Sequence, residues 1–108
     1  MGRLKIVVLC GSTRFRAEYQ RAFYQEEHAG RICLSVPCFK DDSCCKTRED
    51  HDRLDSLHWD KIAIADEILV INVGGYIGKS TRKEIDLARK IGKTIRWWEP
   101  HNSIDWKR

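Results

Sequence analysis

The sequence predicts a single α/β domain in which a four-stranded parallel sheet lies between two layers of helices. Short apolar runs alternate along the chain with amphipathic stretches, which is the pattern of strands joined by crossover helices. The first apolar run, Leu4–Cys10, is rich in β-branched residues and ends directly in Gly11 and Ser12. With 108 residues, of which 42% are hydrophobic, we expect residues 1–108 to form one domain around one modest core.

The first half of the chain predicts two strands on either side of a helix. The run Leu4–Cys10 predicts a strand that is buried on both faces. Apolar and aromatic residues recur at spacings of three and four from about Phe15 to His28, which predicts a helix that Gly30 ends. The run Ile32–Pro37 predicts the second strand.

The second half repeats the alternation twice. We expect a helix from Leu54 to Ala65, a strand over Glu67–Val73, a helix over Ser80–Ile91 that ends at Gly92, and a last strand over Thr94–Trp98. Right-handed crossovers then favour the strand order 2-1-3-4, a small flavodoxin-like or Rossmann-like three-layer fold.

The segment Cys38–Arg53 is polar and has no apolar periodicity. Long loops in compact domains often cover a binding site, but they can equally be solvated connections. We therefore expect residues 38–53 to form either a mobile loop over a site or a plain surface connection.

Charge and hydropathy narrow the possible partners. The net charge of +4 comes from 20 basic and 16 acidic residues that are spread along the chain, which favours a small anionic ligand over nucleic acid. The apolar run near the N-terminus is too short for a signal peptide or for a membrane span. We expect a cytoplasmic protein with neither a nucleic-acid nor a membrane partner.

The five cysteines form no even framework, and without an export signal we expect them to be thiols. No cysteine belongs to a CxxC pair, which disfavours a redox protein. A set of cysteines and histidines could be considered as zinc ligands, but the spacing of this set lacks the usual paired ligands, so we expect no metal and no cofactor. Its members would be Cys38, Cys44, Cys45, His51 and His58.

The predicted topology indicates that the loop after the first strand is part of a ligand site. In open α/β sheets, ligands bind at the carboxyl ends of the strands beside the reversal of strand order, here between the first and third strands. Gly11 allows a sharp turn, and Ser12, Thr13 and Arg14 follow where a helix begins, so they could hold a phosphate or carboxylate. The alternative is that Ser12 or Thr13 only caps the helix.

The loop after the third strand is the second nominated part of the site. Gly75 and Gly78 let a ligand approach the backbone, and Ser80 or Thr81 could cap the next helix, with Glu84 as its capping-box partner. Alternatively, Glu84 is a carboxylate that faces the same crevice as the first loop and can attack or stabilise an electron-poor carbon. The loop lacks the GxxxxGKS frame, which disfavours ATP hydrolysis.

Three motifs together carry a family resemblance. The first strand ends in CGSTR, an Ala65-Asp66 pair precedes an apolar strand, and the helix start has the pattern Ser-Thr-x-x-Glu-x-x-x-Ala over Ser80–Ala88. In order and spacing these motifs resemble the nucleoside 2-deoxyribosyltransferase superfamily, including its small branch, the 2′-deoxynucleoside 5′-phosphate N-hydrolases. The resemblance spans most of the chain outside Cys38–Arg53 and the C-terminal tail. The related PGGxGTxxE motif of the cytokinin-activating phosphoribohydrolases matches less well.

The resemblance implies a mechanism for cleaving an N-glycosidic bond. Glu84 would be the nucleophile that forms a covalent glycosyl-enzyme, which water or a second base then resolves with retention. Ser12, Arg14 and Ser80 would hold a 5′-phosphate if the substrate is a nucleotide, and Tyr76 could cover the sugar or the base. The implied partner is a small nucleoside or nucleotide, and because the resembling enzymes are oligomers, we expect this chain to form a homodimer or a higher homo-oligomer.

One departure from the family pattern bears on the chemistry. Where members usually carry a second catalytic aspartate, this chain has His58. His58 could act as an acid or base near neutral pH, or it could be inert, with Asp55 one turn earlier supplying the carboxylate. A non-catalytic nucleotide-binding module is therefore the alternative function.

The aromatic residues near the C-terminus leave the oligomeric state open. Trp97, Trp98 and Trp106 are compatible with an oligomer interface, where aromatic residues are enriched, or with completion of a small core.

Overall fold

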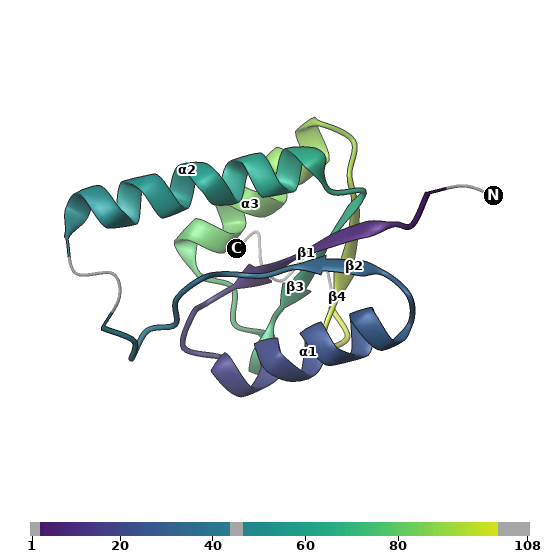
Figure 1. The fold of residues 1–108 in the computed structure, drawn as a ribbon, viewed down its shortest axis with the longest axis horizontal. Coiled ribbons are helices and arrows are strands. Elements are labelled where there is room, and N and C mark those ends of the chain that lie inside the picture. The colour runs from purple at the N-terminus through teal and green to yellow at the C-terminus, as the bar shows by residue number, and fades with distance from the viewer. Residues whose placement is uncertain (1–2, 44–46, 102–108) are drawn as a thin grey trace.

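The computed structural model describes residues 3–43 and 47–101 (Figure 1). Within these residues strands and α-helices alternate, as the sequence predicts, with one short 3-10 turn before the last helix. The elements are β1 (Ile6–Gly11), α1 (Arg16–His28), β2 (Ile32–Leu34), α2 (Arg48–Ile64), β3 (Glu67–Ile71), the short 3-10 turn η1 (Val73–Gly75), α3 (Lys79–Lys90) and β4 (Thr94–Trp97).

The four strands form one parallel sheet in the order β2-β1-β3-β4, which confirms the predicted topology. Figure 1 shows α1 on one face of this sheet and α2 and α3 on the other, so the fold has three layers. In the central pair, Val7 of β1 lies opposite Glu67 of β3, and Gly11 lies opposite Ile71. The carboxyl ends of β1 and β3 therefore meet at the same edge of the sheet.

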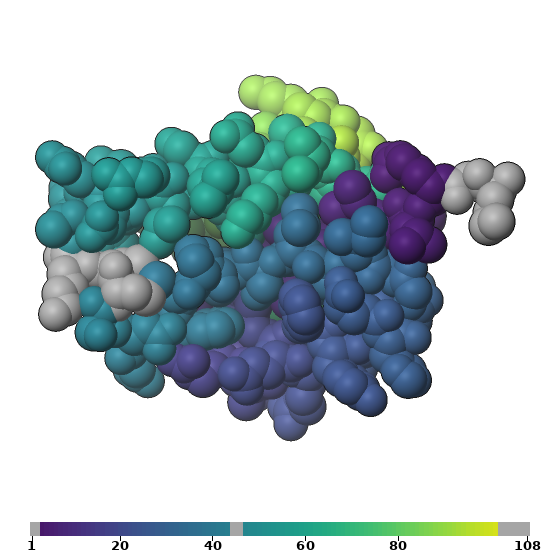
Figure 2. All heavy atoms as spheres, in the orientation of Figure 1, coloured from purple at the N-terminus to yellow at the C-terminus, as the bar shows by residue number. Residues whose placement is uncertain are grey.

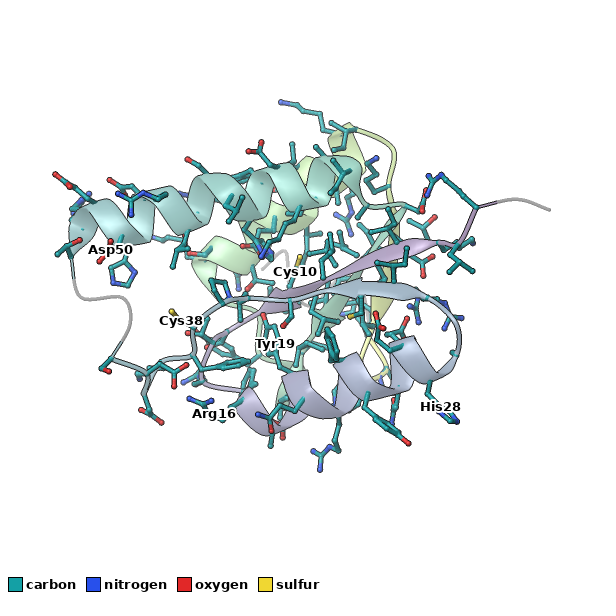
Figure 3. The ribbon with its side chains drawn as sticks, viewed as in Figure 1. Cys10, Arg16, Tyr19, His28, Cys38 and Asp50 are labelled. Atoms are coloured by element: carbon teal, nitrogen blue, oxygen red, sulfur yellow. The ribbon has the colours of Figure 1, made fainter. Side chains whose placement is uncertain are left out.

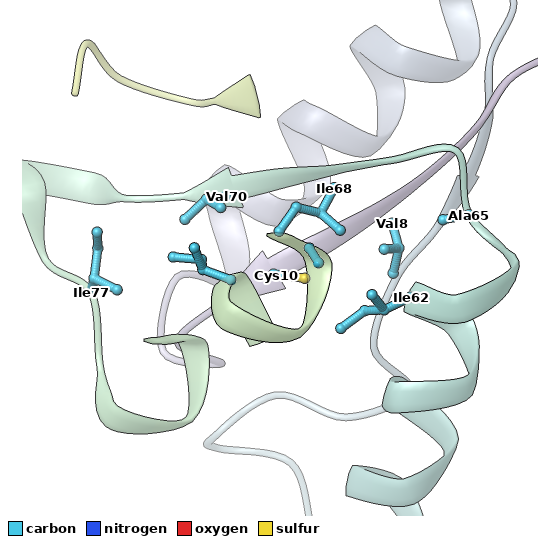
Figure 4. Packing of buried hydrophobic residues seen from close by; sticks show 9 residues of the cluster. Val8, Cys10, Ile62, Ala65, Ile68, Val70 and Ile77 are labelled. Carbon is cyan, nitrogen blue, oxygen red and sulfur yellow. The ribbon is translucent and has the colours of Figure 1, made fainter. Parts of the chain in front are cut away.

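Two apolar cores lie on the two faces of the sheet, because successive side chains of a strand point to opposite sides. Val8 and Cys10 of β1 face α2 and α3, where they belong to one core with Ile62 (Figure 4). Ile85 of α3 belongs to the same core. Val7 and Leu9 face α1 in the second core. Burial on both faces explains why β1 and β3 are continuous apolar runs.

Helix α2 begins at Arg48, six residues before the predicted start at Leu54. Thr47 caps it, since the Thr47 hydroxyl accepts a hydrogen bond from the Asp50 N–H at 3.0 Å, and Glu49 and Asp50 lie in the first turn. Its first turns are largely exposed and carry no apolar stripe that periodicity could detect. The latter part of the predicted loop 38–53 is therefore helical, while residues 44–46 lie outside the described residues.

The expectation that every cysteine is a thiol is wrong at Cys38, which is disulfide-bonded. Cys10 and Cys33 are free and buried, one in each core. That expectation rested on the cytoplasmic location that the N-terminal sequence suggests, where cysteines usually stay reduced. Formation of a disulfide depends on whether two cysteines come within bonding distance, which the sequence does not reveal. Cys44 and Cys45 lie outside the described residues.

Asp66 stabilises the edge of the sheet opposite the carboxyl ends. Its carboxylate accepts hydrogen bonds from the Arg3 guanidinium and from the Ile6 N–H at 2.8 Å. The Arg3 hydrogen bond, followed by that from Ile6, lowers the pKa of Asp66 below its ordinary value. These contacts give Asp66 a structural role.

The C-terminal tryptophans that the structure describes complete the cores. Trp97 packs against the core on the α2 and α3 face, and Trp98 packs against the core on the α1 face. Trp106 lies outside the described residues, and homo-oligomer formation stays a prediction. Among residues 3–43 and 47–101, no helix has both the length and the apolar character needed to cross a bilayer.

Replacing Gly11 with alanine should destabilise the fold by about 1–3 kcal/mol, because overpacking at a tight backbone contact forces the strands apart. A Cβ at this position would lie 2.9 Å from the Ile71 carbonyl oxygen and 3.0 Å from the Ile71 Cβ. The measurement is urea denaturation. Gly30→Ala is the control for backbone strain alone, since both glycines have a positive φ (157° at Gly11 and 88° at Gly30) but a Cβ at Gly30 meets no atom within 4 Å, so its loss should be smaller. Equal losses in the two variants would contradict the close approach.

Candidate active site

A cleft of about 480 Å³ opens at the carboxyl ends of β1 and β3. Its walls come from the loop after β1, the segment after β2, the inner side of α2, and the loop that leads into α3. In Figure 2 the surface is hollowed between α2 and the segment that follows β2. A volume in this range suits a small organic ligand such as a nucleotide.

The loop after β1 lines the cleft with Gly11, Ser12 and Thr13. Neither hydroxyl caps α1, because the N-cap of that helix is Phe15, which makes no side-chain capping bond. The Ser12 hydroxyl instead accepts a weak hydrogen bond from the Arg14 N–H at 3.4 Å. The capping alternative for this loop is therefore wrong, and both hydroxyls lie where a ligand can meet them.

Arg14 and Gly75 are the two predicted site residues that do not line the cleft. The Arg14 guanidinium is exposed and lies 4.0 Å from the ring centroid of Tyr76, a cation–π contact. Gly75 supplies a positive φ of 81° to the turn before Tyr76, which lines the cleft. Arg14 and Gly75 thus help to position Tyr76 at the cleft, although they do not line it themselves.

The start of α3 forms the opposite side of the cleft. Its N-cap is Gly78, which has no side chain to cap the helix, and Ser80 and Thr81 belong to the first helical turn. The predicted capping box between Thr81 and Glu84 is therefore wrong. Uncapped N–H groups and the positive end of the helix dipole face a cleft that Gly78, Ser80 and Thr81 all line. This end of α3 is suited to an anionic group.

Glu84, freed from a capping role, meets two side chains from other elements. Its carboxylate lies 3.7 Å from Nε2 of His58, and the Cys10 thiol donates a hydrogen bond to it. The Cys10 Sγ also lies 3.5 Å from the same His58 nitrogen. Figure 3 shows Cys10 on β1, on the α2 and α3 side of the sheet. The strand end, the middle of α2 and the second turn of α3 thus converge on one point.

Burial sets the protonation of this cluster. It raises the pKa of Glu84 to about 7, an effect that the Cys10 hydrogen bond opposes and the nearby charge of Asp55 reinforces. Burial also lowers the pKa of His58 to about 4, with a further contribution from Lys61. The pKa of the Cys10 thiol is well above its ordinary value, chiefly through burial and then through Glu84. At neutral pH the imidazole is neutral and Glu84 is partly protonated.

Among the described residues, no hydrogen bond at Nδ1 fixes the tautomer of His58. Nδ1 is buried and has no hydrogen-bond partner among the described residues. Nε2 can therefore present either its N–H or its lone pair to Glu84 and Cys10.

Asp55 is exposed and also lines the cleft, so the predicted second carboxylate shares the space with Glu84. Sequence reasoning did not single out two further polar residues of the site, one that lines the cleft and one that is buried beneath it. Lys61, whose ammonium donates a hydrogen bond to the Ser35 carbonyl at 2.7 Å, lies one turn after His58 on the same side of α2, a spacing that could have identified it. Cys10 was treated only as a buried residue at a strand end.

The segment after β2 closes one side of the cleft, and Cys38, Phe39 and Asp42 line it. Asp42 accepts a hydrogen bond from the Phe39 N–H at 2.8 Å and forms an ion pair with Arg16 of α1. Phe39 packs edge-on against Tyr19. Residues 38–42 are thus tied to α1 and border the cleft, and their role as a mobile loop over a site stays a prediction.

No protein-family model matches this chain, and no curated protein has a significantly similar sequence.

The burial of Glu84 predicts a pH-dependent stability difference. A carboxyl group whose pKa is about 7 in the folded protein and 4.5 in the unfolded chain makes the folded state bind more protons, so its contribution to stability is lost between about pH 4.5 and 7. The stability of Glu84→Gln relative to the unaltered protein should rise across this window by up to roughly 3 kcal/mol. Denaturant midpoints measured at several pH values give this difference.

The matched control is Asp86→Asn, which removes an exposed carboxylate from the same helix outside the cleft. Its stability curve should run parallel to that of the unaltered protein. A Glu84→Gln curve that is also parallel would contradict the raised pKa. The opposite pH dependence of His58 is common to all three proteins and does not enter the comparison.

Proposed function

We propose that this protein cleaves or transfers the N-glycosidic bond of a nucleoside or nucleoside 5′-monophosphate, with ribose or deoxyribose, through a covalent glycosyl-Glu84 intermediate. The observation that supports it best is the position of the Glu84 carboxyl. It lines a cleft of nucleotide size, a few residues from the start of α3 and opposite the hydroxyls of the β1 loop. A nucleophile and an anion-binding end of a helix therefore share one cavity.

In this proposal the ligand lies across the edge of the sheet. The sugar is placed over Glu84, so that a carboxylate oxygen can attack the anomeric carbon while the base departs with the bonding electron pair. A 5′-phosphate is placed against Ser12 and Ser80, near the N–H groups of the first turn of α3. The half-exposed ring of Tyr76 borders the same cavity and offers a stacking surface.

Glu84 must be ionised to attack. Because its pKa is about 7, the active fraction should grow as the pH rises through neutrality. The neutral imidazole of His58 cannot protonate a departing base at this pH, since its pKa is about 4. Solvent then supplies that proton, and water or a second base resolves the glycosyl ester.

A second candidate function is binding of a nucleotide without turnover. It is favoured by His58, which stands where the resembling family has its second acid and is neutral at neutral pH. The same cleft would then hold the ligand without a complete acid and base pair.

Release of free base separates the two candidates. Purified protein, incubated with ribo- and deoxyribonucleosides and their 5′-monophosphates, with and without a second base, should release base from at least one substrate. Glu84→Gln should lower that rate about 10³-fold or more, because a lost nucleophile removes the covalent path. Chromatography of the free base gives the rate.

Asp86→Asn again serves as the control and should retain full activity. Absence of base release from every substrate, together with retained nucleotide binding, would support the binding module. Equal rates for Glu84→Gln and the unaltered protein would contradict Glu84 as the nucleophile.

The placement of a phosphate group predicts a selective loss of affinity. Ser12→Ala and Ser80→Ala should each raise KM for a 5′-monophosphate about tenfold, since a hydrogen bond to a charged group is lost, and should leave KM for the nucleoside nearly unchanged. Steady-state kinetics on the matched pair of substrates measures this. Ser56→Ala, on the exposed side of α2, is the control. Equal changes for both substrates would mean that these hydroxyls do not bind phosphate.

A further inference from the structure

We infer that the Cys10 Sγ, the His58 Nε2 and the Glu84 carboxylate form a binding site for a thiophilic divalent cation of the Zn²⁺ type. Among the described residues, these three are a group whose ligand atoms all lie within 4.8 Å of one another. Binding of an ion at this point does not depend on the proposed glycosidase activity.

The spacing of the three atoms fits tetrahedral coordination. Zinc bonds of about 2.0–2.3 Å at tetrahedral angles place neighbouring ligand atoms roughly 3.3–3.6 Å apart. The Cys10 Sγ lies 3.5 Å from the His58 Nε2, which in turn lies 3.7 Å from a Glu84 oxygen. The third pair, the Cys10 Sγ and a Glu84 oxygen, lies within 4.8 Å, so an ion at the common point requires this pair to close by roughly 1 Å at most through side-chain rotation.

The ligands come from three elements that the fold holds rigidly. Cys10 is fully buried on β1 in the core that packs against α2 and α3, and His58 is 9% exposed. Glu84 belongs to α3, whose Ile85 and Ala88 are buried in that same core. A site on packed strands and helices needs no folding of a loop to form.

Charge balance also favours a divalent ion. A thiolate and a carboxylate together carry two negative charges, and a neutral imidazole carries none, so a divalent cation makes the buried group neutral. Binding releases the thiol proton to solvent, together with any proton held by Glu84, and no electron transfer is involved. His58 Nε2 can offer its lone pair because no hydrogen bond within the described residues fixes the ring from Nδ1.

The fourth coordination position would face the cleft. His58 and Glu84 line the cavity, whereas Cys10 lies fully buried beneath them. Three protein ligands with one position open to water is the arrangement typical of exchangeable or catalytic zinc. If Glu84 is the nucleophile proposed above, an ion bound here occupies it, so zinc should inhibit base release; this consequence alone rests on the proposed function.

Titration of the reduced, metal-free full chain with Co²⁺ tests the site directly. Tetrahedral Co²⁺ with a thiolate ligand gives intense visible bands and a near-ultraviolet charge-transfer band, and Zn²⁺ should displace it. Cys10→Ser should abolish the charge-transfer band, and Glu84→Gln and His58→Gln should each weaken binding at least about tenfold.

Cys33→Ser is the matched control, because Cys33 is also a free buried thiol but lies in the core on the opposite face of the sheet. It should bind Co²⁺ like the unaltered protein. A charge-transfer band that persists in Cys10→Ser would assign the ion to other cysteines and overturn the inference, as would the absence of tetrahedral bands in the unaltered protein. Circular dichroism shows whether each variant is folded. If Cys10→Ser does not fold, unchanged Co²⁺ affinity in both Glu84→Gln and His58→Gln would overturn the inference.

The outcome is separable from that of the proposed function. Tetrahedral Co²⁺ bands that depend on Cys10 support the metal site whether or not any nucleoside is cleaved. Base release that is lost in Glu84→Gln supports the glycosidase whether or not Co²⁺ binds.

Discussion

The parallel pairing of β1 with β3 is the constraint on which the arrangement of the candidate site depends. It sets Gly11 opposite Ile71, so the loops that follow the two strands emerge side by side at one edge of the sheet. The pairing is tight enough that a Cβ at Gly11 would touch the Ile71 carbonyl. The same pairing brings Cys10, the residue before this glycine, under α3, where it reaches Glu84. The cleft and its chemistry therefore follow from the central strand pair.

Burial gives the Cys10, His58 and Glu84 cluster its character. Burial favours the neutral form of each group, because removing a charge from water is costly. The pKa values of Cys10 and Glu84 are therefore raised, and the pKa of His58 is lowered. A carboxyl group with a pKa near 7 can change its charge at neutral pH when an electrophilic sugar or a cation arrives. The same physical property underlies both proposals, one for a covalent bond to carbon and one for a bond to a metal.

The topology and the two loops that border the cleft were predictable because they depend on local patterns and on general rules of sheet connection. Apolar runs gave the strands, and the rule that ligands bind at the carboxyl ends of the strands identified the two loops. The capping of α3 was not predictable, because Ser80 and Thr81 satisfy the motif for a helix that actually begins one residue earlier, at Lys79. The role of Cys10 was also hidden, since its contact with His58 joins residues 48 positions apart that no local pattern connects.

The most direct test of the central claim is to trap the intermediate. Protein incubated with the best substrate and quenched in acid should gain the mass of one glycosyl group, and peptide mapping should place it on Glu84 within Lys79–Lys90. A rapidly formed adduct on Glu84 that disappears when a second base or excess time is allowed is the predicted result. Base release without any adduct, or an adduct on another residue, would contradict a glycosyl-Glu84 intermediate.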